Sequence, residues 1–170
     1  MKACAPLTAL AGVLFALASQ AWAGEKDEKE PSIILEMGGS GEWGLQRGSM
    51  PGFGPEIGFE YDMHWLEIEA ATSPKVSHGQ AEIGTDFLLK KPFEISERWE
   101  FLIGGGPEWV HKTSESPKDS LAAEAALEFV YAPFDNENIR VYAEPTYSYD
   151  FGKGHEQSLG FTAGLLIKLR

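Results

Sequence analysis

Apolar and polar residues alternate along most of the chain after residue 31. In the stretch "PEIGFEYD", residues 55–62, Ile57, Phe59 and Tyr61 occupy one face of an extended segment, and acidic residues such as Glu60 occupy the other. A two-residue period of this kind is typical of a β-strand with one apolar and one polar face. The function of the protein depends on which of the two faces meets water.

The same period returns eight times and predicts strands over residues 32–45, 53–62, 64–72, 79–91, 98–111, 120–132, 139–151 and 158–170. The stretch "SLAAEAALEFVY" is rich in helix-favouring residues, but its apolar residues fall on alternate positions, so we predict a strand there as well. Turn-forming clusters, among them "KPFEISE" and "SPKVSHG", separate the strands. We therefore predict an all-β fold, an eight-stranded antiparallel up-and-down β-barrel, because closure leaves no strand edge exposed.

Two kinds of barrel fit this pattern. A secreted, lipocalin-like barrel would turn its apolar face inward around a ligand, and a transmembrane barrel would turn it outward toward lipid. Strands of about 9–11 residues suffice to cross a bilayer, and most of the expected strands are that long. Many glycines lie on the acidic face, where the narrow interior of an eight-stranded barrel leaves little room. Aromatic residues near the strand ends predict interfacial girdles, with Trp43, Trp99, Trp109, Tyr131 and Tyr147 as candidates. The transmembrane β-barrel is the favoured prediction.

The first 31 residues predict export. Lys2 precedes a short apolar run that ends in "AWA", the pattern of a secretory signal peptide over residues 1–23. A flexible charged lead-in, residues 24–31, follows, and we expect the barrel domain to occupy residues 32–170. The only cysteine, Cys4, lies in the expected signal peptide, so no disulfide is expected in the mature chain. A net charge of −12 argues against a nucleic-acid partner.

The pattern resembles the small eight-stranded outer-membrane barrels of Gram-negative bacteria, of the OmpA/OmpX kind. More narrowly, "FLLKKPFEIS", "GGGPEWVH" and "EPTYSYDFGKGHEQSLGFTAGLLI" resemble an uncharacterised family of proteobacterial outer-membrane proteins. The resemblance implies a cell outer membrane location, termini and short turns in the periplasm, insertion by the outer-membrane assembly machinery, and a monomer among outer-membrane lipids and lipopolysaccharide. Basic residues in the expected outward loops would then lie near lipopolysaccharide phosphates: Arg47, Lys75, Lys112, Lys118 and Lys153.

A lipid-facing apolar side would enclose the charged side in the lumen. The expected lumen charge network contains Glu36, Glu56, Glu67, Glu69, Asp86, Glu100, Glu128, Glu144, Lys90, Arg140 and Lys168. Buried charge without a partner is costly, so these carboxylates must be paired, hydrated or protonated. A hydrogen-bonded polar plug and a narrow cation-selective pore both remain open, and the narrow eight-stranded interior favours the plug.

The stretch "GHEQS" is the one candidate for catalysis. His155, Glu156 and Ser158 lie close in sequence at an expected outward hairpin, and some eight-stranded barrels are lipid A deacylases in which a histidine activates a serine. The spacing places the histidine and serine side chains on opposite faces if both lie on one strand, and a polar hairpin turn, which is the favoured interpretation, explains the residues as well. The four histidines lack metal-ligand spacing, so we expect no metal and no cofactor.

These patterns predict a non-enzymatic, porin-like outer-membrane barrel with an acid-rich closed interior and a structural or surface-interaction role. A narrow cation pore, an outer-leaflet lipid hydrolase and a secreted lipocalin-like binder are the alternatives.

Overall fold

The computed structural model describes residues 30–77, 80–113, 119–134, 138–152 and 154–169, which form eight β-strands. The strands are β1 (Ser32–Gly44), β2 (Gly52–Asp62), β3 (Glu67–Ser77), β4 (Gln80–Ser96), β5 (Trp99–Lys112), β6 (Asp119–Tyr131), β7 (Ile139–Asp150) and β8 (Gln157–Lys168). The expected signal peptide, residues 1–23, and residues 24–29 of the expected lead-in lie outside the described residues.

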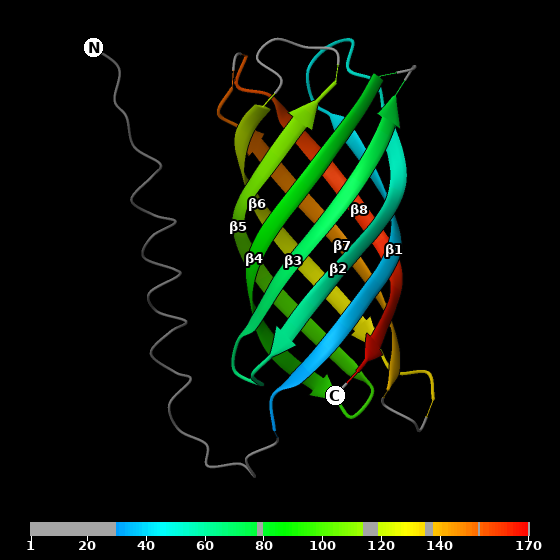
Figure 1. Cartoon of the computed structure of the whole chain (residues 1–170). Helices are drawn as coiled ribbons and strands as arrows, with labels where there is room; N and C mark the ends of the chain where they lie inside the picture. Colours follow the sequence, from blue (N-terminus) through cyan, green and yellow to red (C-terminus); the bar gives the residue numbers. More distant parts are fainter. Residues whose placement is uncertain (1–29, 78–79, 114–118, 135–137, 153, 170) are drawn as a thin grey trace, which may run out of the picture.

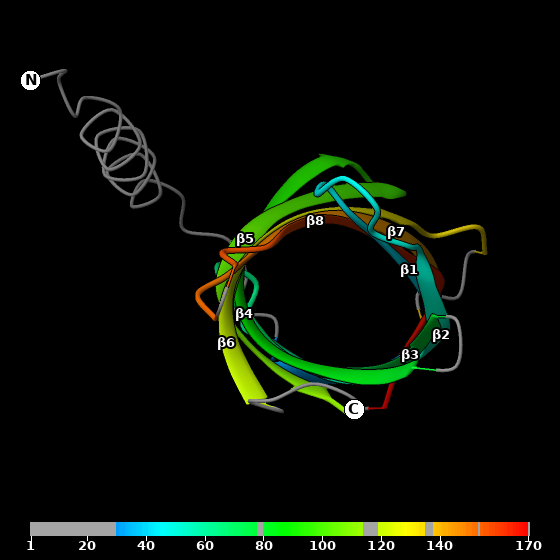
Figure 2. The same cartoon turned by 90° about the horizontal axis from the view of Figure 1, so that it is seen from above.

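The strands form one closed barrel in which each is antiparallel to its neighbours in sequence (Figures 1 and 2). The barrel closes where β1 pairs with β8, for example at Gly38 and Gly164. The predicted fold class is therefore confirmed. We call the end that carries the connections after β1, β3, β5 and β7 the loop end, and the opposite end, where β1 begins and β8 finishes, the turn end (Figure 1).

The two-residue period separates an outer from an inner face in every strand. In β6, Leu121, Leu127 and Phe129 are exposed on the outside, and Glu128 and Val130 are buried inside. The helix-like composition of this segment does not prevent strand formation, because β5 and β7 supply hydrogen-bonding partners on both sides.

Two strands, β3 and β4, extend about five residues beyond the predicted limits. The segment "KPFEIS", predicted as part of a turn, belongs to β4, where Phe93 pairs with Phe101 of β5. At the other end of the barrel, β3 continues to Ser77. The predicted ends of β3 and β4 were wrong for the same reason. A strand continues as long as its neighbour supplies backbone hydrogen-bonding partners. A register shift between Glu94 and Ser96 then brings the chain into the short turn before Trp99.

The apolar core is small and lies inside the barrel toward the turn end. It is a buried cluster from five strands: Ile34, Leu102, Val130, Tyr142 and Leu166. In sequence, Leu88, Leu102 and Val130 interrupt the alternation; in the structure these side chains keep their inward direction and are buried in the interior. No helix among the described residues is long and apolar enough to cross a membrane.

Candidate functional site: the enclosed lumen and its two ends

A single lysine lies at the centre of the charged interior. Lys90 projects from β4 and is only 1% exposed. Its ammonium group contacts the carboxylates of Glu69 on β3 and Glu144 on β7, and it donates a 2.8 Å hydrogen bond to Glu128 on β6. Strands from opposite sides of the wall therefore meet at one cation. Charge-assisted hydrogen bonds of this kind are strong where water is absent.

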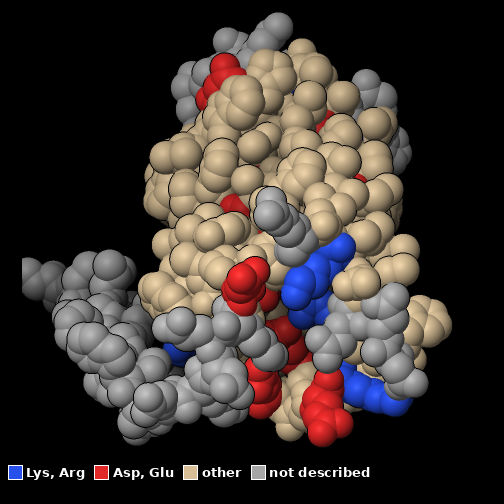
Figure 3. Space-filling model, turned by 60° about the horizontal axis from the view of Figure 1, so that its bottom comes forward, with Lys and Arg blue, Asp and Glu red and all other residues tan. Residues whose placement is uncertain are grey.

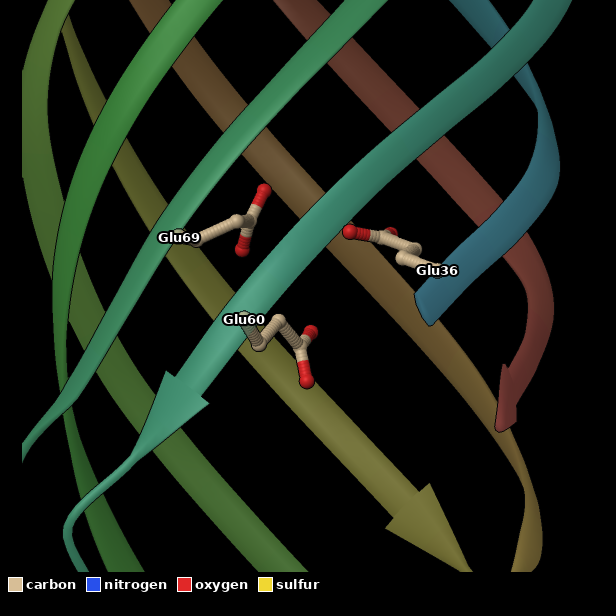
Figure 4. Close-up of side chains that lie close together, drawn as sticks. All are labelled: Glu36, Glu60 and Glu69. Carbon is tan, nitrogen blue, oxygen red and sulfur yellow. The ribbon is translucent and has the colours of Figure 1, made fainter. Parts of the chain in front are cut away.

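Further carboxylates crowd around this group. Glu36, Glu60 and Glu67 are each at most 5% exposed and project inward from β1, β2 and β3. Carboxylate oxygens of Glu36, Glu60 and Glu69 (Figure 4) all lie within 4.8 Å of one another, as do those of Glu60, Glu67 and Glu128. The region therefore holds more buried carboxylates than Lys90 can contact.

We call Lys90 and the carboxylates around it the charged layer. The apolar cluster lies next to the charged layer, on the side of the turn end. Ile34, Val130 and Tyr142 each lie two residues from an acid of the charged layer and so occupy the next inward position of their strands. Beyond them, Arg140 donates a 2.9 Å hydrogen bond to Glu100 near the rim. Figure 3 shows charged side chains gathered at this end, beneath an outer wall that is mostly uncharged.

The loop end is open by comparison. A cavity of about 520 Å³ opens there, and Glu42, Lys75, Glu82 and Lys112 are among its lining residues. We call this cavity the vestibule. Lys75 donates a 2.5 Å hydrogen bond to Glu42, and both side chains are partly exposed.

A cavity of about 20 Å³ lies deeper in the barrel than the vestibule and shares several lining residues with it. Glu56 and Asp86 are among its lining residues. Side-chain hydroxyls satisfy some of the acids at this depth: Ser148 donates a 2.7 Å hydrogen bond to Glu108, and Thr162 donates a 3.2 Å bond to Glu56. The lumen therefore narrows from the vestibule toward the charged layer around Lys90.

Most of the expected lumen charge network lies on the inner face. Buried or half-buried inside the barrel are Glu36, Glu56, Glu67, Glu69, Asp86, Lys90, Glu100, Glu128, Arg140 and Glu144. Lys168 is the exception. It pairs with Ile34 in the register, but it is the last residue of β8 and is exposed at the turn end. Its assignment to the enclosed network is corrected, because its side chain is exposed at the end of β8.

The catalytic candidates are not brought together. His155 has a positive φ of 49° in the turn before β8, and its exposed ring stacks on Tyr149 at a centroid distance of 5.9 Å. Ser158 is 9% exposed and lines the vestibule from inside. Glu156 forms an ion pair with Lys112 at 2.8 Å. The imidazole and the hydroxyl thus lie on different faces of the wall, which does not suit proton transfer between them.

The expected girdle residues lie on the outer face near both ends. Trp99 packs against Tyr131 at the turn end, with ring centroids 4.6 Å apart. Toward the loop end, Trp43, Trp109 and Tyr147 are between 38% and 48% exposed. Amphipathic aromatic rings in these two bands suit the two interfaces of a bilayer.

The sequence prediction misplaced two basic residues, Lys75 and Lys112, and missed one tyrosine. Lys112 is the last residue of β5 and lines the vestibule. Lys75 was expected in an outward loop but faces the lumen from β3, because the inward parity of Ala71 and Ser73 continues to position 75. Lys118 and Lys153 lie outside the described residues, and Arg47 lines the vestibule. Tyr142, which alternates with Glu144 on the inner face of β7, was not singled out; parity with Glu144 is the signal that could have found it.

No protein-family model matches the chain, and no curated protein sequence matches it. Solved structures do match. Neisserial surface protein A superimposes with a TM-score of 0.72 at 15% identity, covering 83% of this chain and 100% of that one. OprG of Pseudomonas aeruginosa gives 0.63 at 14% identity, covering 84% and 98%. Ail, the attachment invasion locus protein of Yersinia pestis, gives 0.58 at 11% identity, covering 83% and 100%. The chain therefore has the fold of the small eight-stranded outer-membrane β-barrels, and at these identities the likeness shows the fold alone.

Proposed function

We propose that the chain is an integral outer-membrane β-barrel with a closed, acid-rich interior and a structural or surface-interaction role without catalysis. The observation that supports this most is the outward apolar face. Phe59, Phe87, Leu127 and Leu165 are between 42% and 55% exposed, on four different strands. In water, leaving such side chains uncovered would forfeit roughly 25 cal/mol for each Å² of apolar surface. A hydrocarbon environment removes that cost.

The arrangement is the reverse of a lipocalin-like one. In a soluble binder, Phe59 and Phe161 would pack in the centre, and Glu60 and Glu144 would face solvent. Here the two phenylalanines are 54% and 47% exposed and the two glutamates are 2% and 3% exposed. The secreted binder is therefore not favoured.

Burial at the level of Lys90 supports a closed interior over a cation path. A water-filled path leaves the side chains that line it accessible to water. Lys90, Leu88, Leu102 and Glu128 are at most 1% exposed. We therefore expect stable conduction to be absent in planar lipid bilayers, and regular cation-selective single-channel steps would overturn the closed-interior proposal.

The proposed membrane orientation follows the two ends of the barrel. The termini and the turn end would face the periplasm, and the vestibule would open to the cell surface, among lipopolysaccharide and outer-leaflet lipids. The assembly machinery of the outer membrane would insert the barrel after removal of the signal peptide. The closed β1–β8 seam supports a monomer, since it leaves no strand edge for another copy.

Membrane insertion can be tested by fractionation and gel mobility. We expect the mature protein in the outer-membrane fraction, and we expect it to migrate differently unheated than boiled. Phe87→Arg, near the middle of β4, should destabilise the barrel in lipid by about 2–4 kcal/mol, because it places a charge against hydrocarbon. Phe87→Leu is the matched control. A freely soluble periplasmic product, or equal stability of both variants, would contradict the proposal.

The hydrolase alternative has its own test. Lipid A mass spectra from cells that express the wild type or Ser158→Ala should be identical, because no imidazole in the described part of the chain shares the face of Ser158. A missing acyl chain with the wild type alone would revive catalysis.

A further inference from the structure

Three glutamates on three neighbouring strands point into one space. Glu36 on β1, Glu60 on β2 and Glu69 on β3 project into the interior (Figure 4), and each offers a carboxylate oxygen within 4.8 Å of the other two. Ca²⁺ lies about 2.3–2.6 Å from its oxygen ligands, so oxygens around one Ca²⁺ ion can be up to about 5 Å apart. The spacing of the three carboxylates therefore fits one such ion. We call these residues the glutamate trio.

Two members of the glutamate trio, Glu36 and Glu60, make no ion pair with a basic residue in the described part of the chain. Both carboxylate oxygens of Glu60 are buried without a hydrogen-bond partner among the described residues, and the buried Glu36 carboxylate is faced by the Tyr142 hydroxyl. The two residues are 1% and 2% exposed. Lys90 makes its ion pair with Glu69 of the trio and directs its other contacts to two different carboxylates. Buried carboxylates in this position need a cation or a proton.

A second kind of side chain points to the same place. The buried hydroxyl of Tyr142 faces the Glu36 carboxylate from β7, close enough to donate a hydrogen bond to it. A Cβ atom on Gly38 would lie 2.6 Å from this hydroxyl, and one on Gly58 would lie 2.8 Å from Glu36 Oε2. The wall therefore lacks side chains at the two positions where Tyr142 and Glu36 project. A phenol beside a metal-bound carboxylate or a metal-bound water is a common supporting contact.

We propose that the glutamate trio binds one divalent cation, Ca²⁺ in preference to Mg²⁺, with the Tyr142 hydroxyl hydrogen-bonded to a ligand of the ion. Carboxylate oxygens are ligands of hard cations, and an enclosed site favours Ca²⁺ because Mg²⁺ gives up its water reluctantly. The ion would join β1, β2 and β3 inside the barrel. The inference rests on the enclosed interior and does not depend on where the barrel resides.

Two cavities extend from the loop end part of the way toward the site. Carboxylates line the vestibule, and Glu56 and Asp86 line the deeper cavity below it. A cation that enters at the loop end therefore meets acidic side chains at successive depths. Alternatively, the ion is enclosed as the strands close around it during folding.

The test uses the full mature chain, refolded in detergent micelles from denatured protein and therefore free of lipopolysaccharide. Refolding is carried out with calcium chloride or with EDTA, and gel filtration in metal-free buffer follows. Calcium content is then measured by elemental analysis. We expect about one retained Ca²⁺ per chain, and a higher temperature for conversion to the boiled gel form than after refolding with EDTA.

Isosteric variants locate the site. Glu36→Gln and Glu60→Gln should retain about a tenth or less of the wild-type calcium, because each removes a ligand charge. Glu82→Gln, a vestibule variant with the same change in charge, should retain the wild-type amount. Tyr142→Phe, which changes no charge, should weaken calcium binding by about 10- to 100-fold.

Several results would overturn the site. The proposal fails if wild-type protein refolded with calcium contains no more calcium than protein refolded with EDTA. That result is expected if protons alone neutralise the glutamate trio. Because this comparison uses only the wild type, it tests calcium binding even where a variant does not fold. Equal loss of calcium in Glu82→Gln and Glu36→Gln would indicate diffuse binding to the acidic lumen. Failure of this test would leave the membrane location untouched, because fractionation measures that separately.

Discussion

The two halves of the lumen use the same residue types in different surroundings. Toward the turn end, Lys90 and its three carboxylate partners have side chains at most 4% exposed. Toward the loop end, the pair of Lys75 and Glu42 is 13% and 23% exposed. An ion pair in a water-free interior binds its partners tightly and tolerates the loss of neither, whereas water replaces a lost partner near an open cavity. Depth along the barrel therefore decides what each charge contributes.

The most severe test of this difference between the two halves of the lumen is to remove the buried ammonium group of Lys90. Lys90→Met should destabilise the barrel by about 3–5 kcal/mol, because three buried carboxylates lose their shared ammonium group. Urea unfolding in lipid vesicles, followed by tryptophan fluorescence, measures this loss. Lys75→Met is the matched control in the vestibule and should cost much less. Equal losses in the two variants would show that depth does not matter.

The apolar cluster provides the next largest effect. Leu102→Ala should cost about 2–5 kcal/mol, because it leaves a cavity among Ile34, Val130 and Leu166 that the neighbouring strands cannot close. The same unfolding experiment measures it. Ile103→Ala, at the next position of β5, faces outward and should cost less, since lipid tails fill the space. A larger loss from Ile103→Ala would place the core on the wrong face.

A smaller effect is expected within the vestibule. Glu42→Gln removes the 2.5 Å partner of Lys75 but leaves the ammonium group beside water and near Glu108. We expect a loss of about 1 kcal/mol or less, and this loss should shrink in high salt. A loss as large as that of Lys90→Met would mean that the vestibule is closed to solvent.

The smallest effect belongs to the rim of the loop end. Glu156→Gln breaks the ion pair with Lys112, in which the Glu156 side chain is 51% exposed. The expected change in unfolding free energy is below about 0.5 kcal/mol, within the usual range of a surface pair. A loss above that of Glu42→Gln would reverse the order expected from exposure to water.

The strands of the barrel wall, and the face of each strand that is apolar, could largely be predicted from the sequence. The alternation in "PEIGFEYD" and in "SLAAEAALEFVY" predicted two strands that the structure contains, each with its apolar face outward. The ends of β3 and β4 could not be predicted, because proline and turn-forming residues suggested a stop where the neighbouring strand still offered hydrogen bonds. Local composition predicts where a strand can end, and pairing decides where it does.

The interior was less accessible to sequence reasoning. Parity showed that Glu36, Glu60 and Glu69 share a face, but not that their carboxylates converge, because the register between β1, β2 and β3 decides that. The partners of Lys90 are up to 54 positions away along the chain, so no local pattern could identify them. Tyr142 was missed because an inward aromatic residue resembles its outward neighbours until its parity with Glu144 is considered.

The order of residues by itself determined the eight strands, the two faces of each strand and the sign of the charge on the enclosed face, because alternation is a local property with a period of two residues. Only the closed tertiary structure decided which carboxylates share Lys90, which have no ion-pair partner among the described residues, and where the interior passes from an open vestibule to a layer of buried side chains. Those outcomes depend on strand register and barrel diameter, which arise when segments far apart in sequence pair, and which no single segment encodes.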